Sequence, residues 1–315
     1  MDAKEIYINS SHENTPIFHK PYYLDAVIPN GWDVCLYQKG EKILGSMPFI
    51  LKQNNKNRVI CEPSMTQYLG PWFWDNLEDI SVSNYGKILD QLYSQLPPHD
   101  IIEQSWHYRL NNCLPMYSKG YTLGVRYTYQ MPSVENPEQW IARFNSNAKR
   151  NLKKANNNLT VKILTDFDLF FNMLKSTFER KRQSNPYQYD KFKRLDEAFI
   201  KHDSRQILGA YDEGDELCGA VYLMWDKYNV YYLAGGIKAE KSSTGAIHLL
   251  FMEGFKKAHI MNKVFDFEGS MIPQVELFFR SFGSIPKPYY HIKKINSKKL
   301  KLKYLASDIL KTFRS

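Results

Sequence analysis

The stretches YQKGEKILG (Tyr37–Gly45) and YDEGDELCG (Tyr211–Gly219) share the pattern Tyr-x-x-Gly-x-x-Ile/Leu-x-Gly, position by position. In each stretch a strand-like segment, a glycine-containing turn and a second strand-like segment follow one another, which is the order of a β-hairpin. Because the two hairpins lie in different halves of the chain, the match indicates a structural unit that occurs twice.

The segments that follow the two hairpins correspond as well. Each hairpin is followed by a predicted strand containing Tyr-Leu, a helix, a short strand with acidic or amide side chains, a short helix ending at glycine, and a tyrosine-rich strand. Both halves therefore predict a mixed, mostly antiparallel sheet flanked by helices, with a ligand crevice beside the strand that precedes the longer helix. The segments are Ser64–Pro71, Leu77–Leu96, Asp100–Trp106, Asn111–Gly120 and Val125–Met131 in the first half, and Asn229–Gly236, Ala246–Ala258, Val264–Ser270, Gln274–Gly283 and Lys287–Ile295 in the second.

Length and charge support two domains of different character. A chain of 315 residues is long enough for two ordinary domains, each with its own core. Residues 1–135 carry 11 Lys and Arg against 14 Asp and Glu, whereas residues 136–315 carry 31 against 19. The basic second half could attract RNA, phosphorylated small molecules or anionic lipid, and a solvated basic face is an equally good interpretation.

Cysteine usage and the N-terminal sequence predict a cytoplasmic protein. Cys35, Cys61, Cys113 and Cys218 form no CxxC pair and have no histidine at metal-ligand spacing, so we expect reduced, buried thiols and no metal site. The first 16 residues lack the features of a signal peptide, and no apolar run is long enough for a transmembrane helix.

The acidic strand VFDFEG (Val264–Gly269) is the most unusual feature of the second half. Alternation places Asp266 and Glu268 on one face of this strand and the two phenylalanines on the other. Carboxylates therefore occupy a sheet face where a hydrophobic core is expected.

The order of elements resembles the GNAT acyltransferase fold, and its duplication resembles the tandem-GNAT Fem family of aminoacyl transferases and GNAT-like acyltransferases. SNAKRNLKKA (Ser146–Ala155) is similar to the family's Lys/Arg-Arg-Asn-x-x-Lys-Ala run. FDFEG followed by FFRSFG (Phe278–Gly283) is similar to Phe-Asp-Phe-x-Gly with a downstream Phe-Lys-x-x-Phe-Gly, although the family lysine falls on Phe279 here and only Arg280 supplies a charge. YLGPWFWD (Tyr68–Asp75) resembles the family's Gly-Pro-x-x-Asp turn with one additional residue.

This resemblance implies an α/β protein with two tandem GNAT-like domains. The first would span residues 1–135 and the second residues 136–296. Leu302, Leu305, Ala306, Ile309 and Phe313 in residues 297–315 have helical spacing, and in the Fem family the chain end returns to the first domain. We therefore expect a C-terminal helix that packs on the N-terminal domain, with a lysine-rich membrane-surface helix as the alternative.

GNAT enzymes transfer an acyl group directly from an activated donor to an amine, without a covalent enzyme intermediate. The sequence agrees with this chemistry, because it contains no Gly-x-Ser-x-Gly nucleophile motif. Glu268 is the first candidate for the general base that deprotonates the amine, and Asp266 is the second. An equally good interpretation is that both carboxylates accept hydrogen bonds from nearby amides.

Further site residues follow from the same motifs. Arg150 and Lys149, at the start of a basic helix, are candidates for binding a phosphorylated substrate, as the resemblance implies. KAEKSSTGA (Lys238–Ala246) corresponds to the pyrophosphate loop of acetyl-CoA enzymes but lacks its spacing and first glycine, which favours another activated donor. Ser242, Ser243 and Thr244 could also serve only to cap the following helix. The remaining candidates are Arg280, Ser270 and Tyr68 for substrate binding and Ser243, Thr244, Gly245 and Ala246 for donor binding.

The sequence therefore predicts a bacterial N-acyltransferase that acts on an amine of a small molecule or cell-envelope precursor. It requires no bound cofactor, and its donor co-substrate is aminoacyl-tRNA or acyl-CoA, so tRNA is a candidate partner. One alternative is an acetyl-CoA-dependent N-acetyltransferase. Another is an inactive GNAT-like module that binds RNA or a nucleotide-sugar with its basic half.

Overall fold

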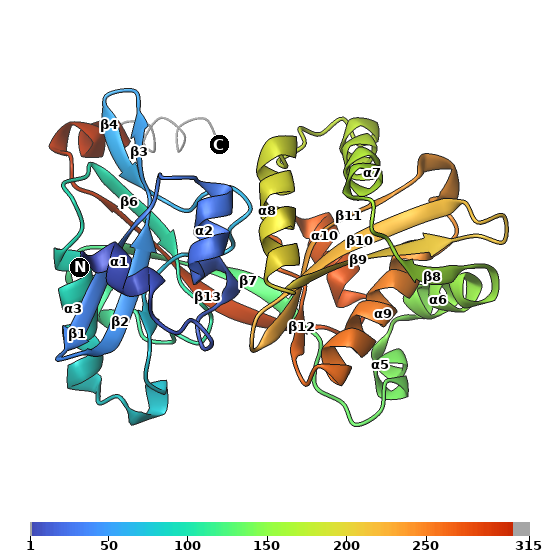
Figure 1. Ribbon diagram of the computed structural model, residues 1–315, viewed down its shortest axis with the longest axis horizontal. Helices are drawn as coiled ribbons and strands as arrows, with labels where there is room; N and C mark the ends of the chain where they lie inside the picture. Colours follow the sequence, from blue (N-terminus) through green and yellow to red (C-terminus); the bar gives the residue numbers. More distant parts are fainter. Residues whose placement is uncertain (1, 305–315) are drawn as a thin grey trace. The chain divides into compact units, whose positions relative to one another are not determined.

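The computed structural model describes residues 2–304 and contains two compact units (Figure 1). Unit 1 comprises the residues up to Arg126 and those from Pro288 onward, and unit 2 comprises Tyr127–Lys287. The boundaries fall inside two long strands, β7 (Thr122–Gln130) and β13 (Ile285–Ile295). Strand β7 therefore begins in unit 1 and ends in unit 2, and strand β13 begins in unit 2 and ends in unit 1.

Unit 1 is built around two groups of strands. The hairpin β1–β2 pairs with β5, while β3, β4, β6 and β13 follow one another through antiparallel, parallel and antiparallel pairing. Helix α3 (Val82–Ser94) packs its buried face on β1 and β2. The other elements of this unit are α1 (Ala3–Ile8), α2 (Pro21–Val27), β1 (Asp33–Lys39), β2 (Lys42–Phe49), β3 (Leu51–Asn54), β4 (Asn57–Ile60), β5 (Trp72–Phe73), β6 (Ile101–Ser105) and α4 (Leu114–Ser118).

Unit 2 is a sheet with helices on both faces. Strands β8, β9, β10 and β11 pair antiparallel, and β11 then pairs parallel with β12, which in turn meets the end of β7. Its elements are α5 (Glu138–Arg143), α6 (Ser146–Asn158), β8 (Thr160–Ile163), α7 (Phe167–Arg180), α8 (Tyr189–Lys201), β9 (Arg205–Tyr211), β10 (Leu217–Trp225), β11 (Asn229–Ile237), α9 (Ala246–Ile260), β12 (Val264–Asp266) and α10 (Pro273–Arg280).

Alternation along β10 shows how the two faces of this sheet are covered. Val221 and Leu223 belong to a core cluster with the apolar residues of α6, α9 and α10. Tyr222 between them points to the other face, where its ring contacts Phe170 of α7 and Phe192 of α8. Figure 1 shows α7 and α8 on one side of these strands and α6 and α9 on the other. Residues Leu217–Met224 of β10 are all buried, and their sequence lacks polar–apolar alternation, as expected for a strand covered on both faces.

The structure confirms the predicted fold class and most of the predicted elements. It corrects one strand, because residues 64–71 form no regular structure. This segment contains a turn at Met65, whose φ is 70°, and it ends in Gly70-Pro71, neither of which suits a paired strand. The hairpin β3–β4 was not predicted, since polar, mostly exposed residues run from Lys52 to Arg58 and only its ends are apolar.

The predicted domains, residues 1–135 and 136–296, differ from the two compact units at their edges. Residues from Pro288 group with unit 1, because β13 pairs with β6 from His291 to Ile295. Residues 298–304 are helical, while residues 305–315 of the predicted C-terminal helix lie outside the described residues, so its docking stays a prediction.

The cysteines agree with the sequence-based expectation of reduced thiols. All four are free; Cys35, Cys113 and Cys218 are buried, and Cys61 is half-buried. Within residues 2–304, no helix has the length and apolar character needed to cross a membrane.

Candidate functional site

The parallel pair β11–β12 separates early, and this separation creates the candidate site. The two strands pair only from Asn229–Val264 to Tyr231–Asp266, after which β12 ends. On its other side β11 pairs with β10 around a β-bulge, in which Leu233 is the additional residue. Bulges of this kind redirect side chains and are frequent beside active sites. Beyond Tyr231, β11 therefore has no strand partner on this side among the described residues.

The chain turns sharply just after β12. Glu268 and Gly269 both adopt left-handed backbone conformations, with φ values of 58° and 69°. A side chain at Gly269 would place its Cβ 2.2 Å from the carbonyl oxygen of Tyr127, so only glycine fits there. The expectation that Glu268 continues the strand alternation is therefore wrong, because this turn removes it from the sheet.

Asp266 is a buried carboxylate with three hydrogen-bond donors. The hydroxyl of Thr128 donates to one oxygen, and Gln130 Nε2 donates to the other over 2.8 Å. The backbone N–H of Glu268 also donates to Asp266 Oδ1 over 2.8 Å. Burial raises the pKa of Asp266 to about 6, although the three donors act in the opposite direction. Through these bonds Asp266 connects the turn at Glu268 to the neighbouring strand β7.

Glu268 lies in a less polar environment. Its Oε1 is shielded from solvent, and burial raises the pKa of Glu268 well above its usual range, with a smaller contribution from the Asp266 charge. The charge of Glu268 in turn raises the pKa of Tyr187 and Tyr232, in addition to the larger effect of their burial. A carboxyl group with a raised pKa is suited to proton exchange near neutral pH.

A cavity of about 440 Å³ opens where β11 and β12 have separated. Tyr232, Gly235 and Gly236 of β11 form one wall, and Phe278 and Phe279 of α10 form another. The lining is completed by α7, α9 and Asn151 of α6, so that all the lining residues belong to unit 2. Glu268 does not line this cavity itself. Tyr232 does line it, and the charge of Glu268 contributes to the raised pKa of Tyr232.

Tyr187 fixes the strand at the same point. Its hydroxyl donates a hydrogen bond to the carbonyl oxygen of Leu233, the bulged residue of β11, over 2.8 Å. Since Tyr187 precedes α8, this bond ties the α7–α8 connection to the bulge. No sequence pattern predicts this contact, because local residue spacing does not indicate which strand the loop meets.

Two polar residues of the cavity were not predicted. His248, in the first turn of α9, is nine-tenths buried, and burial lowers its pKa to about 4, so its ring is neutral at neutral pH. Its Nε2 lies 3.5 Å from Asn151 Nδ2. His248 stands among the apolar residues of the first half of α9, Ala246–Met252, and this is the sequence signal that could have identified it.

The cavity rim carries positive charge. Arg180 and Lys181, at the C-terminal end of α7, both line it, and Arg180 donates to the carbonyl oxygen of Ile237 over 3.3 Å. In the sequence their position is explained by the helix dipole alone, which favours cations at a helix C-terminus. The structure adds that they lie beside an apolar cavity, where an anionic group of a ligand could reach them.

Two residues of the predicted donor-binding loop lie in the wall of the cavity, and the role of the loop in donor binding stays a prediction. Ser243 and Gly245 line the cavity, whereas Thr244 and Ala246 do not. The N-cap residue of α9 is Gly245, with a φ of 82°, and not a serine or threonine, but the hydroxyl of Thr244 accepts a hydrogen bond from the N–H of Ala246, the first residue of the helix, over 3.3 Å. A Cβ at this glycine would lie 2.3 Å from the carbonyl oxygen of Asn151, so close packing against α6 requires glycine.

The structure places the other candidates of unit 2 around this cavity rather than in it. Arg150 and Lys149 are exposed on α6, where Arg150 donates to Asn147 Oδ1 over 2.7 Å. Arg280 is exposed and lies 3.4 Å from the carboxylate of Glu276. Ser270 Oγ accepts a hydrogen bond from the backbone N–H of Ile272. Their roles in substrate binding stay predictions.

Tyr68 lies in unit 1. It is fully buried, and its ring contacts those of Phe18 and His107 at centroid distances of 4.9 and 4.6 Å. These contacts are typical of a core residue. The role of Tyr68 in substrate binding stays a prediction.

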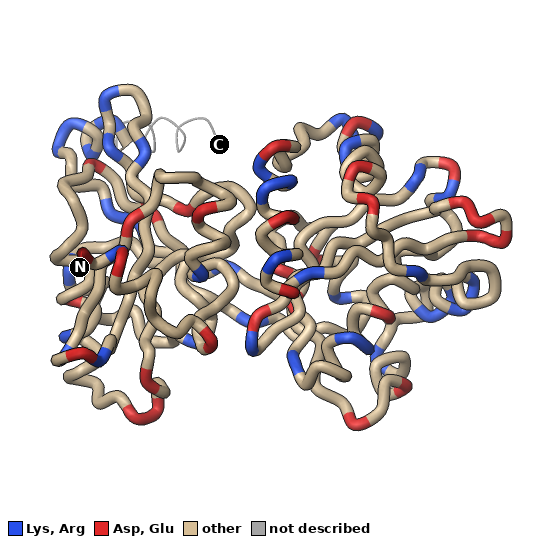
Figure 2. Tube along the Cα trace, viewed as in Figure 1, with Lys and Arg blue, Asp and Glu red and all other residues tan. Residues whose placement is uncertain are grey.

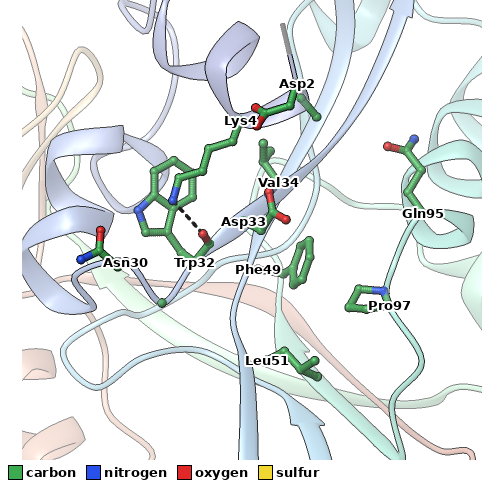
Figure 3. A pocket seen from close by; sticks show the side chains of 12 residues that line it. Asp2, Lys4, Asn30, Trp32, Asp33, Val34, Phe49, Leu51, Gln95 and Pro97 are labelled. Carbon is green, nitrogen blue, oxygen red and sulfur yellow. Dashed lines mark hydrogen bonds between the residues drawn. The ribbon is translucent and has the colours of Figure 1, made fainter.

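Unit 1 contains a larger but chemically simpler cavity, of about 740 Å³, around Trp32 (Figure 3). The ammonium of Lys4 lies 4.1 Å from the Trp32 ring centroid and donates to the Trp32 carbonyl oxygen over 2.9 Å. The carboxylates of Asp2 and Asp33 accept hydrogen bonds from backbone N–H groups of Glu5 and Val34. Because these charged groups already serve the local structure, the cavity of unit 2 is the better candidate.

Within the described residues, no three His, Cys, Asp or Glu side chains are grouped as the ligands of a metal ion would be.

Comparison with known proteins identifies the fold. No protein-family model and no curated protein sequence matches the chain. Among solved structures, FemX matches with a TM-score of 0.69 and 12% sequence identity, covering 91% of this chain and 94% of FemX.

Two further structures match over nearly the whole chain. The C-terminal domain of a putative lysylphosphatidylglycerol synthetase from Agrobacterium fabrum has a TM-score of 0.54 and 10% identity, with 95% of both chains covered. A conserved protein of unknown function from Bacteroides thetaiotaomicron has a TM-score of 0.55 and 7% identity, with 93% of this chain and 95% of that chain covered. At these identities the likeness concerns the fold, and the chain thus has the Fem-like, GNAT-type α/β fold that its repeated element order predicts.

Proposed function

We propose that the protein is an acyltransferase that moves an acyl or aminoacyl group from an activated donor to an amine. The observation that carries this proposal is the cavity at the separated strands β11 and β12. This cavity combines an apolar lining with a cationic rim. Its lining residue Tyr232 interacts electrostatically with Glu268, whose carboxyl group has a raised pKa. The likeness to FemX and to a putative lysylphosphatidylglycerol synthetase domain supports aminoacyl transfer in particular.

The reaction needs few catalytic groups. The amine nitrogen attacks the donor's carbonyl carbon, and the resulting tetrahedral intermediate expels the thiolate of a CoA ester or the ribose hydroxyl of an aminoacyl-tRNA. Before the attack, the ammonium transfers one proton to Glu268. After the attack, the nitrogen loses a second proton, which passes to the leaving group or, when a thiolate leaves and stays ionised, to solvent. Glu268 then releases its own proton to solvent, which returns the carboxylate to its starting state.

The cavity provides the position for this chemistry. A volume of about 440 Å³ accommodates the acyl arm of a donor, and Arg180 and Lys181 can pair with the phosphates that both donor classes carry. Backbone N–H groups near the bulge at Leu233 are fixed by the Tyr187 hydrogen bond and can stabilise the negative oxygen of the intermediate. As the acceptor, we propose an amine on an anionic cell-envelope precursor.

The functional test compares the two donor classes directly. The protein is incubated with acetyl-CoA or with aminoacyl-tRNA in the presence of amine acceptors, including cell-envelope precursors, and acceptor-dependent loss of donor is measured. Turnover of aminoacyl-tRNA supports the proposal in its preferred form, and turnover of acetyl-CoA alone assigns an N-acetyltransferase. Tight binding of a donor or nucleotide-sugar with no turnover of either donor would contradict the proposal and favour a binding module.

The cationic rim gives a separate prediction. We expect Arg180→Ala to raise the KM for the donor about tenfold and to change kcat little, because a charge-assisted contact to a donor phosphate is lost. Lys175→Ala is the matched control, since Lys175 is an exposed cation on the same helix that does not line the cavity. Steady-state kinetics over a range of donor concentrations checks this, and equal effects of both substitutions would contradict it.

A further inference from the structure

A second basic surface lies in unit 1, outside the cavity of unit 2. The hairpin β3–β4 and the helical residues 298–304 carry seven exposed cations and no carboxylate (Figure 2). We call this surface the basic face. Its cations are Lys52, Lys56, Arg58, Lys298, Lys299, Lys301 and Lys303.

Asp100 joins the two parts of the basic face. Its carboxylate accepts a hydrogen bond from the backbone N–H of Arg58 over 2.8 Å, and its carbonyl oxygen accepts one from the N–H of Asn296 over 2.7 Å. Arg58 belongs to β4, and Asn296 immediately precedes the helical segment. The cations of the hairpin and of the helix therefore lie on neighbouring chain segments.

The acidic groups beside the basic face leave it with an excess of positive charge. Asp100, whose carboxylate accepts the backbone bond from Arg58, sets one negative charge against the seven cations. Glu103 lies 2.9 Å from His291 Nε2 and 3.3 Å from Lys293 Nζ, and these contacts keep the pKa of Glu103 low, at about 2. The negative charge of Glu103 is therefore paired with His291 and Lys293, which are not part of the basic face.

The helical segment is arranged unfavourably for a helix in water alone. Lys299 and Lys303 stand four residues apart, so their like charges lie on the same side of the helix and destabilise it. An anionic partner would remove this repulsion. The arrangement is therefore better explained by a surface that meets negative charge than by helix stability.

Exposed apolar side chains accompany these cations. Leu302 is 70% exposed, Tyr304 is 40% exposed, and Leu51 on β3 is 37% exposed. Phosphate groups of a nucleic acid need only the cations, whereas a lipid surface also accepts apolar side chains below its headgroups. The mixture of lysine with exposed leucine and tyrosine therefore favours lipid.

We propose that the basic face docks unit 1 on a membrane surface containing anionic lipid. The cations attract the lipid phosphates, while Leu302, Tyr304 and Leu51 enter the boundary between headgroups and acyl chains. This proposal does not depend on the reaction assigned to unit 2, and it is tested without turnover.

The test is sedimentation of the purified protein with vesicles. One preparation contains phosphatidylcholine only, and the other contains equal parts of phosphatidylcholine and phosphatidylglycerol. We expect binding to the second preparation only, weakened by added salt because surface charge is screened. Absence of binding to the phosphatidylglycerol vesicles at low salt would overturn the proposal.

Variants locate the surface. The double substitution Lys299→Glu and Lys303→Glu is expected to weaken vesicle binding on the order of 100-fold, since each lysine near an anionic surface contributes about fivefold and reversal adds repulsion. Lys153→Glu with Lys201→Glu is the matched control, because it changes the net charge equally at exposed positions of unit 2. An equal loss in this control would mean that only net charge matters and would overturn the proposal.

A third variant separates lipid from nucleic acid. Leu302→Ser keeps every charge and is expected to weaken vesicle binding about tenfold, since it removes an apolar side chain from the boundary, while RNA retention on a filter stays unchanged. Normal vesicle binding by this variant, together with RNA binding that the two lysine substitutions abolish, would overturn the proposal in favour of a nucleic-acid surface. Circular dichroism confirms that the exposed substitutions leave the fold intact.

Discussion

Replacing Glu268 with glutamine is expected to lower kcat on the order of 100-fold while the protein stays folded. The substitution keeps the shape of the protonated side chain but removes its ability to accept a proton from the amine. Stopped assays at saturating donor and acceptor measure this effect. Unchanged turnover would remove Glu268 from the mechanism.

The same substitution is expected to stabilise the protein at neutral pH. Burial raises the pKa of Glu268, so the folded protein keeps this proton at pH values where the unfolded chain has already lost it. Rising pH between the unfolded and the folded pKa therefore favours unfolding of the wild type. Glutamine cannot ionise, so the variant escapes this loss, and a Tm measurement at neutral pH distinguishes a chemical defect from a folding defect.

Asp266→Asn provides the contrasting variant. An asparagine amide would face the donors of Thr128 and Gln130, which now bond to carboxylate oxygens. Because Asp266 is fully buried, we expect a loss of about 2–4 kcal/mol in the free energy of unfolding. A catalytic defect without destabilisation would show instead that Asp266 acts on the substrate.

The pH profile identifies the base independently of the stability measurements. Wild-type turnover should rise with pH as Glu268 ionises, and the midpoint should lie above the ordinary glutamate pKa because burial raises it. In the glutamine variant this rise, the acidic limb of the pH profile, should be absent, and turnover should be slow and nearly independent of pH. An identical limb in both proteins would assign it to another group.

Mild acid is expected to destabilise the protein through two buried histidines of unit 1. His19 is fully buried, and neither of its ring nitrogens has a hydrogen-bond partner within residues 2–304. Burial lowers the pKa of His19 to about 3, and burial with the nearby His19 and Arg109 lowers the pKa of His107 well below its usual range. Both rings are therefore neutral in the folded protein at pH values where the unfolded chain is protonated.

The loss of stability begins near the unfolded histidine pKa of about 6.5 and continues as the pH falls towards the folded value. Each histidine contributes about 2 kcal/mol of destabilisation at about pH 5, from a difference of about 1.5 pH units. His19→Phe, which keeps an aromatic ring beside Tyr68 and Trp72, should remove its share of this acid sensitivity. Urea unfolding at neutral pH and at about pH 5 measures the difference.

The exposed His202 provides the control, because its replacement by glutamine should leave the acid dependence of the wild type unchanged. If His19→Phe and the wild type lost stability equally between the two pH values, the buried histidines would not be responsible. A similar Tm of both proteins at neutral pH would show that the phenyl ring fits the site.

The sequence by itself determined the order of elements and therefore the fold. The repeated hairpin, the apolar helix Ala246–Ile260 and the short helix before Gly283 are defined by side-chain periodicity and turn residues, which act between neighbours along the chain. For the same reason the sequence identified FDFEG as an unusual strand end. The sequence analysis missed the hairpin β3–β4, because its apolar residues stand only at its two ends and show no alternation.

Only the tertiary structure decided which groups meet. Arg180 from α7, Asn151 from α6 and His248 from α9 line one cavity, although no local pattern links their positions. The left-handed turn at Glu268 is imposed by the bonds of Asp266 and by the close approach of Gly269 to Tyr127. Local sequence fixes which segments are strands and helices, because it sets backbone preferences and the apolar face of each element. The gathering of distant side chains depends on how those faces pack, which only the folded chain specifies.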